Sequence, residues 1–451
     1  MPLPINLKRI SDHCLLNNSR LLIVFFFISV SLFGQSYLPS SEFIVDSISI
    51  RGNSITDNDI ILAELTFDRG DLVDSLVLEY NRKRIYSLQL FTSVEMLIFQ
   101  KDSLNHLVID VRESWYIYPI PFIDRNDKDW TKLSYGLDLK IFNFRGRNEL
   151  LSGKVKLGYD PGYSLFYNIP YLFRDEKISL QTDFSYSTRK SKSDVADILY
   201  GESFKQEVFR AVVSVGKRIS LFHRISLFGG FNYIETPRYV KGVNATSSNI
   251  DRYGFAGIRY NYDTRNLNIA PTDGIYFSTE YTHKGFGNSE VDYGIYNFDF
   301  REYRKISGIV HAKWRIALRE AFGKSIPYYD ISILGVDDRV RGHYNTKYEG
   351  NGLITTSLET YFNIIEEFPL EFRLPTVPRS LTRYKINFGF QFFMDAGISR
   401  PSGSSYDFNA MQRGYGFGIT LAVLPYNIAR AEIAFNEEGK SQIILDIGLS
   451  F

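Results

Sequence analysis

The sequence has almost no cysteine and no excess of either charge. Its single cysteine, Cys14, lies in an amino-terminal segment that we expect to be removed, so the processed chain would have no thiol, disulfide or thiolate metal site. Lysine and arginine number 52 and aspartate and glutamate 51, which gives a formal net charge of +1. This balance provides no argument for a nucleic-acid partner.

Long apolar runs are also scarce. Charged residues make up 23% of the chain, and after the first 35 residues no stretch is apolar enough to form a helix in a bilayer. The one short apolar run, 21–30, follows three basic residues and precedes small or polar ones. It is shorter than the ~20 residues of a spanning helix, and the pattern predicts a secretory signal peptide over residues 1–35. An uncleaved anchor helix is the alternative.

Motifs of enzymes are missing as well. The five histidines after the signal are scattered without the spacing of metal ligands. Neither a Gly-x-Ser-x-Gly elbow nor a phosphate-binding loop with Lys-Ser/Thr occurs. The carboxylates are numerous, but none pairs recognisably for acid–base chemistry. We therefore expect no catalytic residues, no metal and no cofactor, and we expect that the chain is not an enzyme.

Aromatic residues are what the sequence has in abundance. They make up 16% of the chain, as 36 Phe and 31 Tyr but only 3 Trp. Phe and Tyr favour strands, and they form girdles at both rims of membrane barrels. From about Trp115 onward, alternating stretches of roughly ten residues recur between turn residues, which is typical of membrane strands. In one of them Lys313 and Arg315 share one face, whereas Trp314 and Ile316 share the other.

About sixteen such stretches lie between Trp115 and the end of the chain. The last one has Ile443, Leu445 and the terminal Phe451 on its apolar face. A barrel in lipid must close, because an open edge would leave backbone N–H and C=O groups unpaired. The sequence therefore predicts a transmembrane antiparallel β-barrel of about 16 strands over residues 115–451. A large soluble β-sandwich or propeller is the alternative.

A short module with a different pattern precedes the barrel. Residues 42–113 predict a small α+β unit in the order strand, helix, helix, strand, strand, or β-α-α-β-β. We expect Thr56 to cap the first helix and Leu72 to lie in the second, after the break at Gly70. The predicted strands cover 43–50, 93–99 and 106–112, with the turn 101–103 between the last two.

This organisation resembles the BamA/TamA-type outer-membrane assembly superfamily, in which the soluble module is a polypeptide-transport-associated (POTRA) domain. Residues 50–53 with Thr56 resemble the start of such a domain. Residues 84–94 resemble its second helix and the beginning of the next strand, although Leu90 stands where the family usually has glycine. The resemblance covers nearly all of the chain after the signal. It implies one POTRA-like periplasmic domain over 42–113.

The most specific match is the motif at residues 339–344. The family carries Val-Arg-Gly-Phe/Tyr at the tip of a long loop that folds back into the barrel lumen, where the arginine pairs with acids of the inner wall. The resemblance implies this role for Arg341, with Asp395 and Glu359 as its partners, and alternation alone places both carboxylates on the inward face. An exposed loop arginine and merely pore-lining carboxylates are the alternatives. The motif residues are Val340, Arg341, Gly342, His343 and Tyr344, with His343 standing in the usual aromatic position.

Two further segments fit the same family. Residues 262–266 with 271–274 resemble its strand-turn-strand signature, and residues 414–418 with 430–432 resemble its penultimate hairpin. Each match is weak alone, but they occur in the expected order with the Arg-Gly loop between them.

The first and last barrel strands define a predicted seam. Pro119 and Pro121 each remove a ladder donor from the first strand, so its pairing with the last strand should be weak. A weak seam would open sideways and release client strands into lipid. The alternative is that the prolines only end a linker and the seam stays closed. The predicted seam residues are Trp115, Pro119, Pro121 and Phe451.

Together these features predict an outer-membrane protein-assembly, insertion or translocation factor of a Gram-negative bacterium. Its POTRA domain would lie in the periplasm and bind client polypeptide by strand addition. The expected partners are unfolded outer-membrane or exported polypeptides, outer-membrane lipid, and accessory lipoproteins or periplasmic subunits, but no nucleic acid. A secretion pore for one dedicated partner and a plain diffusion channel are the alternatives. Family translocators usually have two POTRA domains and a plug helix, and a channel needs neither the module nor the inward loop.

Overall fold

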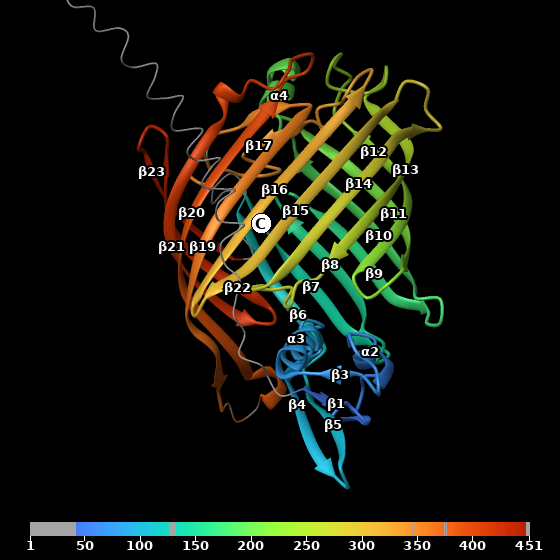
Figure 1. The fold of residues 1–451 in the computed structure, drawn as a ribbon. Helices are drawn as coiled ribbons and strands as arrows, with labels where there is room; N and C mark the ends of the chain where they lie inside the picture. Colours follow the sequence, from blue (N-terminus) through green and yellow to red (C-terminus); the bar gives the residue numbers. More distant parts are fainter. Residues whose placement is uncertain (1–41, 126–131, 345, 374, 376, 448–451) are drawn as a thin grey trace, which may run out of the picture. The chain divides into compact units, whose positions relative to one another are not determined.

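A single antiparallel sheet of sixteen strands makes up most of the computed structural model (Figure 1). Residues 43–451 form one compact unit. The predicted signal peptide, 1–35, and the seam residue Phe451 lie outside the described residues. The structure describes residues 42–125, 132–344, 346–373, 375 and 377–447.

Neighbouring strands of the sheet follow the order of the chain, and each is antiparallel to the next. The one interruption is the pairing of β16 with β19, which leaves residues 324–351 as a loop between them. The predicted number of strands and their antiparallel arrangement are thereby confirmed. The strands are β6 (Ile117–Arg125), β7 (Leu133–Phe144), β8 (Glu149–Gly158), β9 (Gly162–Phe173), β10 (Ile178–Lys190), β11 (Lys205–Arg218), β12 (His223–Glu235), β13 (Ile250–Asp263), β14 (Gly274–Phe286), β15 (Tyr293–Ser307), β16 (Val310–Gly323), β19 (Gly352–Glu371), β20 (Arg383–Arg400), β21 (Gln412–Leu424), β22 (Asn427–Asn436) and β23 (Ser441–Ile447).

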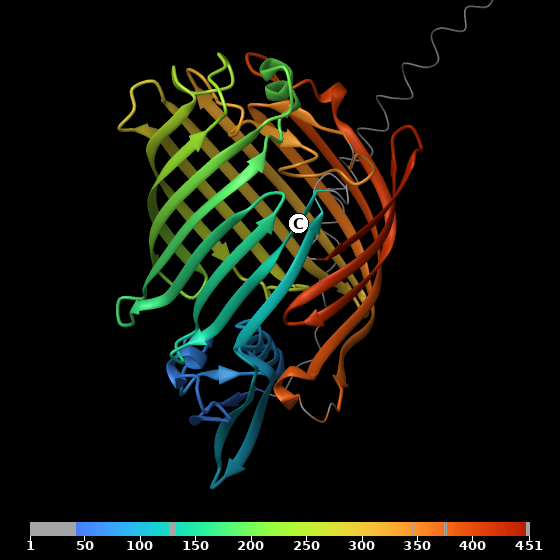
Figure 2. The same ribbon diagram turned by 180° about the vertical axis from the view of Figure 1, so that it is seen from behind.

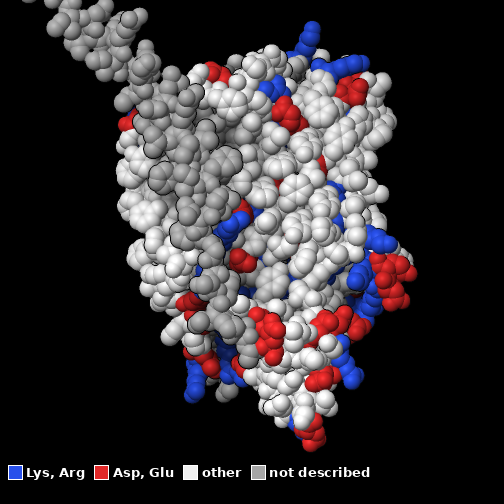
Figure 3. All heavy atoms as spheres, viewed as in Figure 1, with Lys and Arg blue, Asp and Glu red and all other residues white. Residues whose placement is uncertain are grey.

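Side chains alternate between an enclosed and an outer face of this sheet, as the sequence pattern predicts. On the enclosed face, the Lys313 ammonium lies 3.1 Å from the Glu359 carboxylate of the adjacent strand, and Glu359 is fully buried. On the outer face, Phe392 and Met394 of β20 are each more than half exposed. On the face drawn in Figure 3, most of the surface is uncharged, and many of the charged groups lie toward its two ends. An outward apolar band of this kind is typical of a barrel wall that faces lipid.

The sheet curls round so that its first and last strands come to the same side of the unit. Figure 2 shows the first strands in teal and the last strands in red on that side. The longer connections gather at one end of the sheet, the end opposite the amino-terminal module (Figure 1). These connections contain α4 (Asp194–Tyr200), β17 (Ser332–Leu334), β18 (Tyr348–Gly350) and the 3-10 helix η4 (Phe408–Ala410).

The module at the other end has a three-stranded sheet in the order β2-β5-β4, covered by two helices. β2 runs parallel to β5, and β4 is antiparallel to β5. Its core is apolar and closed, because Ile61, Ile85 and Phe91 have no exposed surface. In the described part of the chain no helix has the length and apolar character to cross a membrane. The elements are β1 (Phe43–Ile44), β2 (Ser47–Arg51), α2 (Asn58–Leu62), β3 (Leu72–Val73), α3 (Ser75–Tyr86), β4 (Phe91–Lys101) and β5 (Leu104–Glu113).

Three details of the module differ from the sequence-based expectation. The strand predicted over 43–50 is two strands, β1 and β2, which belong to different sheets. Leu72 is not helical but lies in the short strand β3, where it pairs with Ile44. The helix begins only after Asp74, because the Asp74 carboxylate accepts a hydrogen bond from the Val77 amide (2.8 Å) and caps the first turn. Thr56 does not cap α2 either, since its hydroxyl donates to Glu113 instead (2.7 Å).

Helix α3 of the module packs against the strand turns at this end of the sheet. The Tyr80 hydroxyl donates to the Thr264 carbonyl (2.9 Å) in the β13–β14 turn. The Tyr86 hydroxyl donates to the Leu424 carbonyl (3.0 Å) at the end of β21. Contacts with turns that are far apart along the chain hold the module across this end.

Strands β19 and β20 are longer than the sequence pattern predicts, with 20 and 18 residues. Their extra length continues past the sheet beside the module, and the 3-10 helix η3 (Arg379–Leu381) lies in the turn between them. Two irregularities of register, around Ile365 and Phe368, occur in the extension. They turn Glu367 toward the module, where it pairs with Arg82 at 2.6 Å.

Candidate functional site

The loop between β16 and β19 carries the Arg-Gly motif and lies against the enclosed face of the sheet. A tight turn forms at its tip, where the His343 amide donates to the Val340 carbonyl (3.0 Å). Gly342 has φ of +98°, a conformation that side chains with a Cβ rarely adopt. A Cβ at this position would also lie 2.8 Å from the Phe435 carbonyl oxygen of β22. The glycine of the motif is therefore required by the turn and by its closeness to the wall.

The Arg341 side chain is clamped by Asp395 of β20. Its Nε lies 2.6 Å from one carboxylate oxygen and its Nη2 lies 2.7 Å from the other, which is the bidentate geometry of a strong pair. The Arg341 backbone amide also donates to Asp395 (3.1 Å). Both residues are buried, so the contact fixes the loop to the wall out of reach of solvent.

Two more carboxylates reach the same guanidinium from other strands. The Arg341 Nη1 lies 2.8 Å from Glu359 of β19 and 3.0 Å from Glu432 of β22. Burial alone disfavours the charged form, but these carboxylates and Asp395 raise the pKa of Arg341 above its usual value, so it stays ionised. The guanidinium carbon also lies 3.6 Å from the centre of the Phe393 ring. One loop residue thus connects three strands of the wall.

Glycines in the wall make room for this loop. A Cβ on Gly414 of β21 would lie 1.7 Å from the Arg341 carbonyl oxygen, and a Cβ on Gly397 of β20 would lie 2.7 Å from a methyl carbon of Val340. A Cβ on Gly416 would lie 2.6 Å from the ring of Phe393. The inward glycines of β21, Gly414 and Gly416, therefore leave space for the loop backbone and for the Phe393 ring.

The tip of the motif reaches the last two strands. The His343 Nε2 lies 2.7 Å from a carboxylate oxygen of Glu437, in the β22–β23 turn. The Tyr344 amide donates to the side-chain oxygen of Gln442 on β23 (3.1 Å). The departure from the family pattern, with histidine before tyrosine, thus places both residues against the final hairpin.

The structure brings Arg341 together with both carboxylates named from the sequence, Asp395 and Glu359. Sequence reasoning did not name Glu432 as a partner, and it missed Ser357, whose hydroxyl accepts from the Arg341 Nη2 at 3.1 Å. Alternation along β19 and β22 places both residues on the inward face, so the signal was present in the pattern. Which inward residues meet the loop depends on the stagger of neighbouring strands, which a single sequence does not reveal.

The predicted seam lies between the two edges of the sheet, which among the described residues are β6 and β23. The Phe142 amide of β7 donates to the Tyr116 carbonyl (2.7 Å), so in this register every second residue from Tyr116 onward bonds to β7. Pro119 and Pro121 are among the residues between these, and the backbone groups of those residues point away from β7, toward the free edge. The free edge of β6 therefore lacks two amide donors.

Trp115 modifies the same edge. Its indole N–H donates to the Ile117 carbonyl (2.6 Å). This carbonyl also points toward the free edge, so one acceptor of the edge is already satisfied within the chain. The last strand is different. The Asn436 amide donates to Lys440 (3.1 Å), and the β22–β23 register then turns the backbone groups of Ile443 and Leu445 toward the free edge with their amides intact.

The described residues hold no cluster of three or more His, Cys, Asp or Glu side chains that is arranged to bind a metal ion. The buried carboxylates of the site instead face the Arg341 guanidinium, and Glu359 faces Lys313 as well. The arrangement fixes the loop against the enclosed face of the sheet.

Comparison with known proteins agrees with this architecture. The Omp85 superfamily domain matches residues 143–451, more than half of the chain. BamA from Haemophilus ducreyi lacking POTRA domains 1–3 has a TM-score of 0.52 and 15% identity, over 90% of this chain and 83% of its own. CdiB from Escherichia coli has a TM-score of 0.53 and 11% identity, over 95% of this chain and 82% of its own. At these identities the two likenesses concern the fold alone. No curated protein sequence is a match. With two thirds of its length matched by the family domain and all sixteen strands in place, the chain belongs to the Omp85 superfamily of outer-membrane β-barrel proteins.

Proposed function

We propose that this chain is an outer-membrane factor that inserts or translocates client polypeptides through the seam between β6 and β23. The observation that carries the proposal is the outward edge of β6, where Pro119 and Pro121 remove two donors from any ladder with β23. An unpaired edge is costly in lipid, so such a seam is a place where an incoming strand finds unsatisfied partners. Strand addition there would give a client its first hydrogen bonds inside the membrane.

The module of residues 43–113 supports the proposal as a POTRA-like domain on the periplasmic side. Its sheet order β2-β5-β4 leaves β2 and β4 as edges that can accept an extended client segment. Apart from the two-residue strands β1 and β3, its elements follow the order strand, helix, helix, strand, strand. The BamA chain lacking POTRA domains 1–3 matches 90% of this chain. The sixteen-stranded sheet lies within residues 117–447, which is a smaller share, so the match extends into the module.

The interior of the sheet disfavours an open diffusion channel. Arg341 holds the 324–351 loop against the enclosed face by contacts with three strands, and α3 packs across the far end. A solute path would have to displace both. Passage of one dedicated partner protein remains a separate outcome of the test below.

Depletion of the protein tests the proposal. The outer-membrane proteome and the exported proteins are quantified before and after depletion, with the wild-type chain returned on a plasmid as the control. Loss of several outer-membrane barrels that the plasmid restores is the expected result. Loss of a single exported protein would instead identify a secretion pore. Altered solute uptake with an unchanged proteome would identify a channel, and either of these results would overturn the assembly function.

A further inference from the structure

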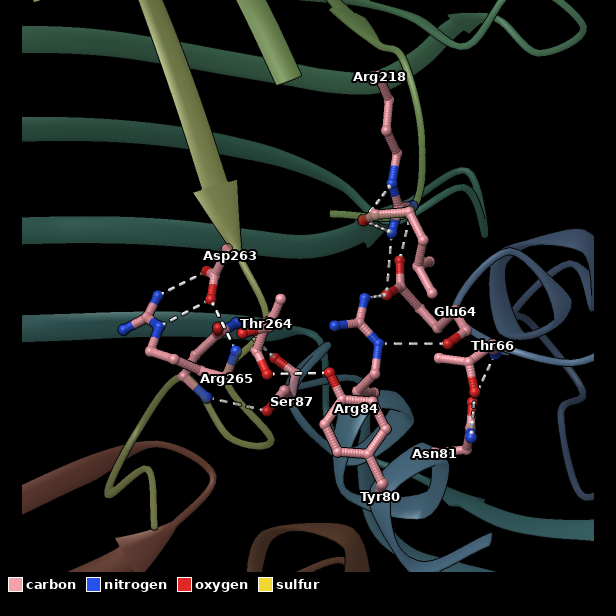
Figure 4. A network of polar contacts seen from close by, with 12 residues as sticks. Glu64, Thr66, Tyr80, Asn81, Arg84, Ser87, Arg218, Asp263, Thr264 and Arg265 are labelled. Carbon is pink, nitrogen blue, oxygen red and sulfur yellow. Dashed lines mark hydrogen bonds and ion pairs between the residues drawn. The ribbon is translucent and has the colours of Figure 1, made fainter. Parts of the chain in front are cut away.

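A polar cavity of about 390 Å³ lies where the module meets the end of the sheet. Arg84 of α3 and Glu64, which follows α2, line it from the module, and Figure 4 shows both pointing toward Arg218 at the end of β11. Arg224 of β12 and Arg265, after β13, line it from the sheet. A cavity of this size is within the range of small-ligand sites, and its walls are rich in guanidinium groups.

Two of these arginines face each other on neighbouring strands. Arg218 and Arg224 are directly opposite in the β11–β12 register. The Ile219 amide donates to the His223 carbonyl (2.9 Å), so these two residues form a hydrogen-bonded pair. The neighbouring pair, Arg218 with Arg224, is therefore a non-hydrogen-bonded pair, in which the side chains lie closest. Like charges in this position repel each other. An anion between them would relieve that repulsion.

The carboxylates of the cavity are already paired. Glu64 lies between two guanidinium groups, 2.6 Å from the Arg84 Nη2 and 2.9 Å from the Arg218 Nη1 (Figure 4). Asp263 forms a pair with Arg265 at 2.8 Å. Within the described residues, the Arg224 guanidinium has neither a hydrogen bond nor an ion pair, although the residue lies in a strand paired on both sides. The cavity therefore has one guanidinium group, that of Arg224, which is not paired with a carboxylate of the cavity.

The position of the cavity decides which anions can enter it. Arg224 is opposite Asn261 in the β12–β13 register, and Asn261 shares its face with Arg259, which pairs with Glu280 across the enclosed side of the sheet. The cavity thus opens toward the inside of the sheet and the module, and not toward the outer face that meets lipid. Side-chain amides of its wall can also bond to a peptide backbone. These are Asn148 and Asn168, whereas the amides of Asn261 and Asn268 already donate to the Ser278 hydroxyl (2.9 Å) and the Ser87 carbonyl (3.4 Å).

We propose that this cavity binds a carboxylate side chain of an extended client polypeptide, with Arg224 and Arg218 as its partners. The proposal rests on the proposed function, since it names where a client is held between the module and the sheet. Glu64 shows that a carboxylate fits beside Arg218, because it already occupies that place from the module side. A client carboxylate that shares Arg218 would weaken its contact with Glu64, and so loosen one attachment of the module.

Peptide binding to the purified full chain tests the assignment. A fluorescent ten-residue peptide with two central Glu residues, amidated at its end, is compared by anisotropy with the same peptide carrying Gln. The Glu peptide is expected to bind more tightly to the wild type, and Arg224→Gln is expected to weaken its binding about tenfold, as for loss of one charged hydrogen bond. Glu64→Gln is expected to strengthen binding, because it frees Arg218.

The matched control is Arg210→Gln, on the same face of β11 and further along the strand, where the guanidinium lies 5.4 Å from the Phe255 ring centre. This variant should bind the Glu peptide as the wild type does. Equal binding of the Glu and Gln peptides, or full binding by Arg224→Gln, would overturn the site. Competition by phosphate beyond that of chloride at equal ionic strength would assign it to phosphate groups instead. Depletion reports on the proposed function independently, so specific peptide binding without loss of outer-membrane barrels would leave the site standing and remove only that function.

Discussion

Arg341 shows how one side chain can hold a long loop inside a membrane barrel. Its guanidinium faces Asp395, Glu359 and Glu432, which come from three different strands. In a buried position each of these carboxylates depends on the positive charge, because an unpaired buried charge is strongly unfavourable. Arg341 therefore couples the tip of the loop to three strands of the wall, beside other contacts of the loop such as Asp338 with Arg315 of β16 (2.8 Å) and Asp330 with Lys284 of β14 (2.6 Å).

Replacing Arg341 by Ala should release the tip of the loop while leaving the sheet intact. Three buried carboxylates would lose this cation, although Glu359 would keep Lys313, and breaking a buried pair in this way costs about 3 kcal/mol or more. We expect faster proteolysis within residues 324–351 and a lower unfolding temperature of the detergent-solubilised protein. Arg341→Lys should restore little, because an ammonium cannot form the bidentate pair. Arg339→Ala, at the exposed neighbouring position, is the control, and equal proteolysis of both Ala variants would contradict the coupling.

Gly414 should be as sensitive as Arg341 although it carries no functional group. A Cβ there would overlap the Arg341 carbonyl oxygen, so Gly414→Ala must push the loop from the wall at a cost of about 1–3 kcal/mol. Proteolysis of the loop measures this displacement. Gly153→Ala on β8, where nothing lies within 4 Å of the new Cβ, is the matched control. In the Arg341→Ala background the Gly414 change should add little, because the loop is already released. A fully additive effect would show that Gly414 acts elsewhere.

At this scale the sequence predicts part of the site and not all of it. Alternation along a strand is local, so it places Asp395 and Glu359 on the inward face, and the resemblance connects them with Arg341. The pairing of Arg218 with Arg224 depends on strand register, and the approach of Glu64 depends on how the module docks. The register is set jointly by two strands and the turn between them, and the docking by contacts between distant segments, so alternation along one strand reveals neither.

Among the elements, the start of α2 is joined to the sheet by a small hydrogen-bond network. Glu113, the last residue of β5, accepts from the backbone amides of Ile55 and Thr56 and from the hydroxyls of Ser54 and Thr56. The Thr56 hydroxyl in turn accepts from the side-chain amide of Asn143 at the end of β7 (2.8 Å). Burial raises the pKa of Glu113, but these donors outweigh burial and lower it overall.

The lowered pKa predicts a pH-dependent contribution of Glu113 to stability. A carboxylate whose pKa is lower in the folded state stabilises the fold above its unfolded pKa, about 4.3 for glutamate, and loses that contribution as the pH falls through the folded value. Glu113→Gln should therefore reduce stability by about 1 kcal/mol near pH 7, a modest figure because the group is partly exposed. Thermal unfolding of both proteins across pH 3–8 measures the difference, and it should shrink below about pH 4. A difference independent of pH would show that the charge of Glu113 has no part in it.

In the module, the sequence predicts the main elements better than it predicts where each element begins and ends. Two helices and the strands β2, β4 and β5 follow in the predicted order, but the short strands β1 and β3 are additional, and the turn at Asp102 and Ser103 has the positive φ values of a two-residue hairpin turn. The predicted start of α3 was wrong because Asp74 caps the helix and thereby sets its first turn. The predicted cap at Thr56 was wrong because the Thr56 hydroxyl donates to Glu113 instead. The extra length of β19 and β20 was also missed, since their ends are stabilised by contacts such as Arg82 with Glu367.

At the scale of the whole molecule, the inward loop and the seam are adjacent. His343 and Tyr344 contact the β22–β23 turn and Gln442 of β23, the strand that forms one edge of the seam. The same loop is fixed by Arg341 to β19, β20 and β22. The loop therefore connects the free edge strand with the more firmly paired strands of the wall, and its release should loosen β23 first.

Locking the seam is expected to abolish activity. The only natural cysteine is Cys14, in the predicted signal peptide, so cysteine pairs introduced within β6 and β23 would be the only thiols of the processed chain. Because Pro119 and Pro121 leave the seam short of donors, lateral opening is the step that such a disulfide blocks, and reduction should restore it. Assembly of client barrels into vesicles containing the oxidised or reduced protein measures the effect. A control disulfide between Leu137 and Val155, which are opposite in the paired strands β7 and β8, should leave activity unchanged. Full activity with β6 and β23 joined would rule out lateral opening, because no client strand could then pass between them.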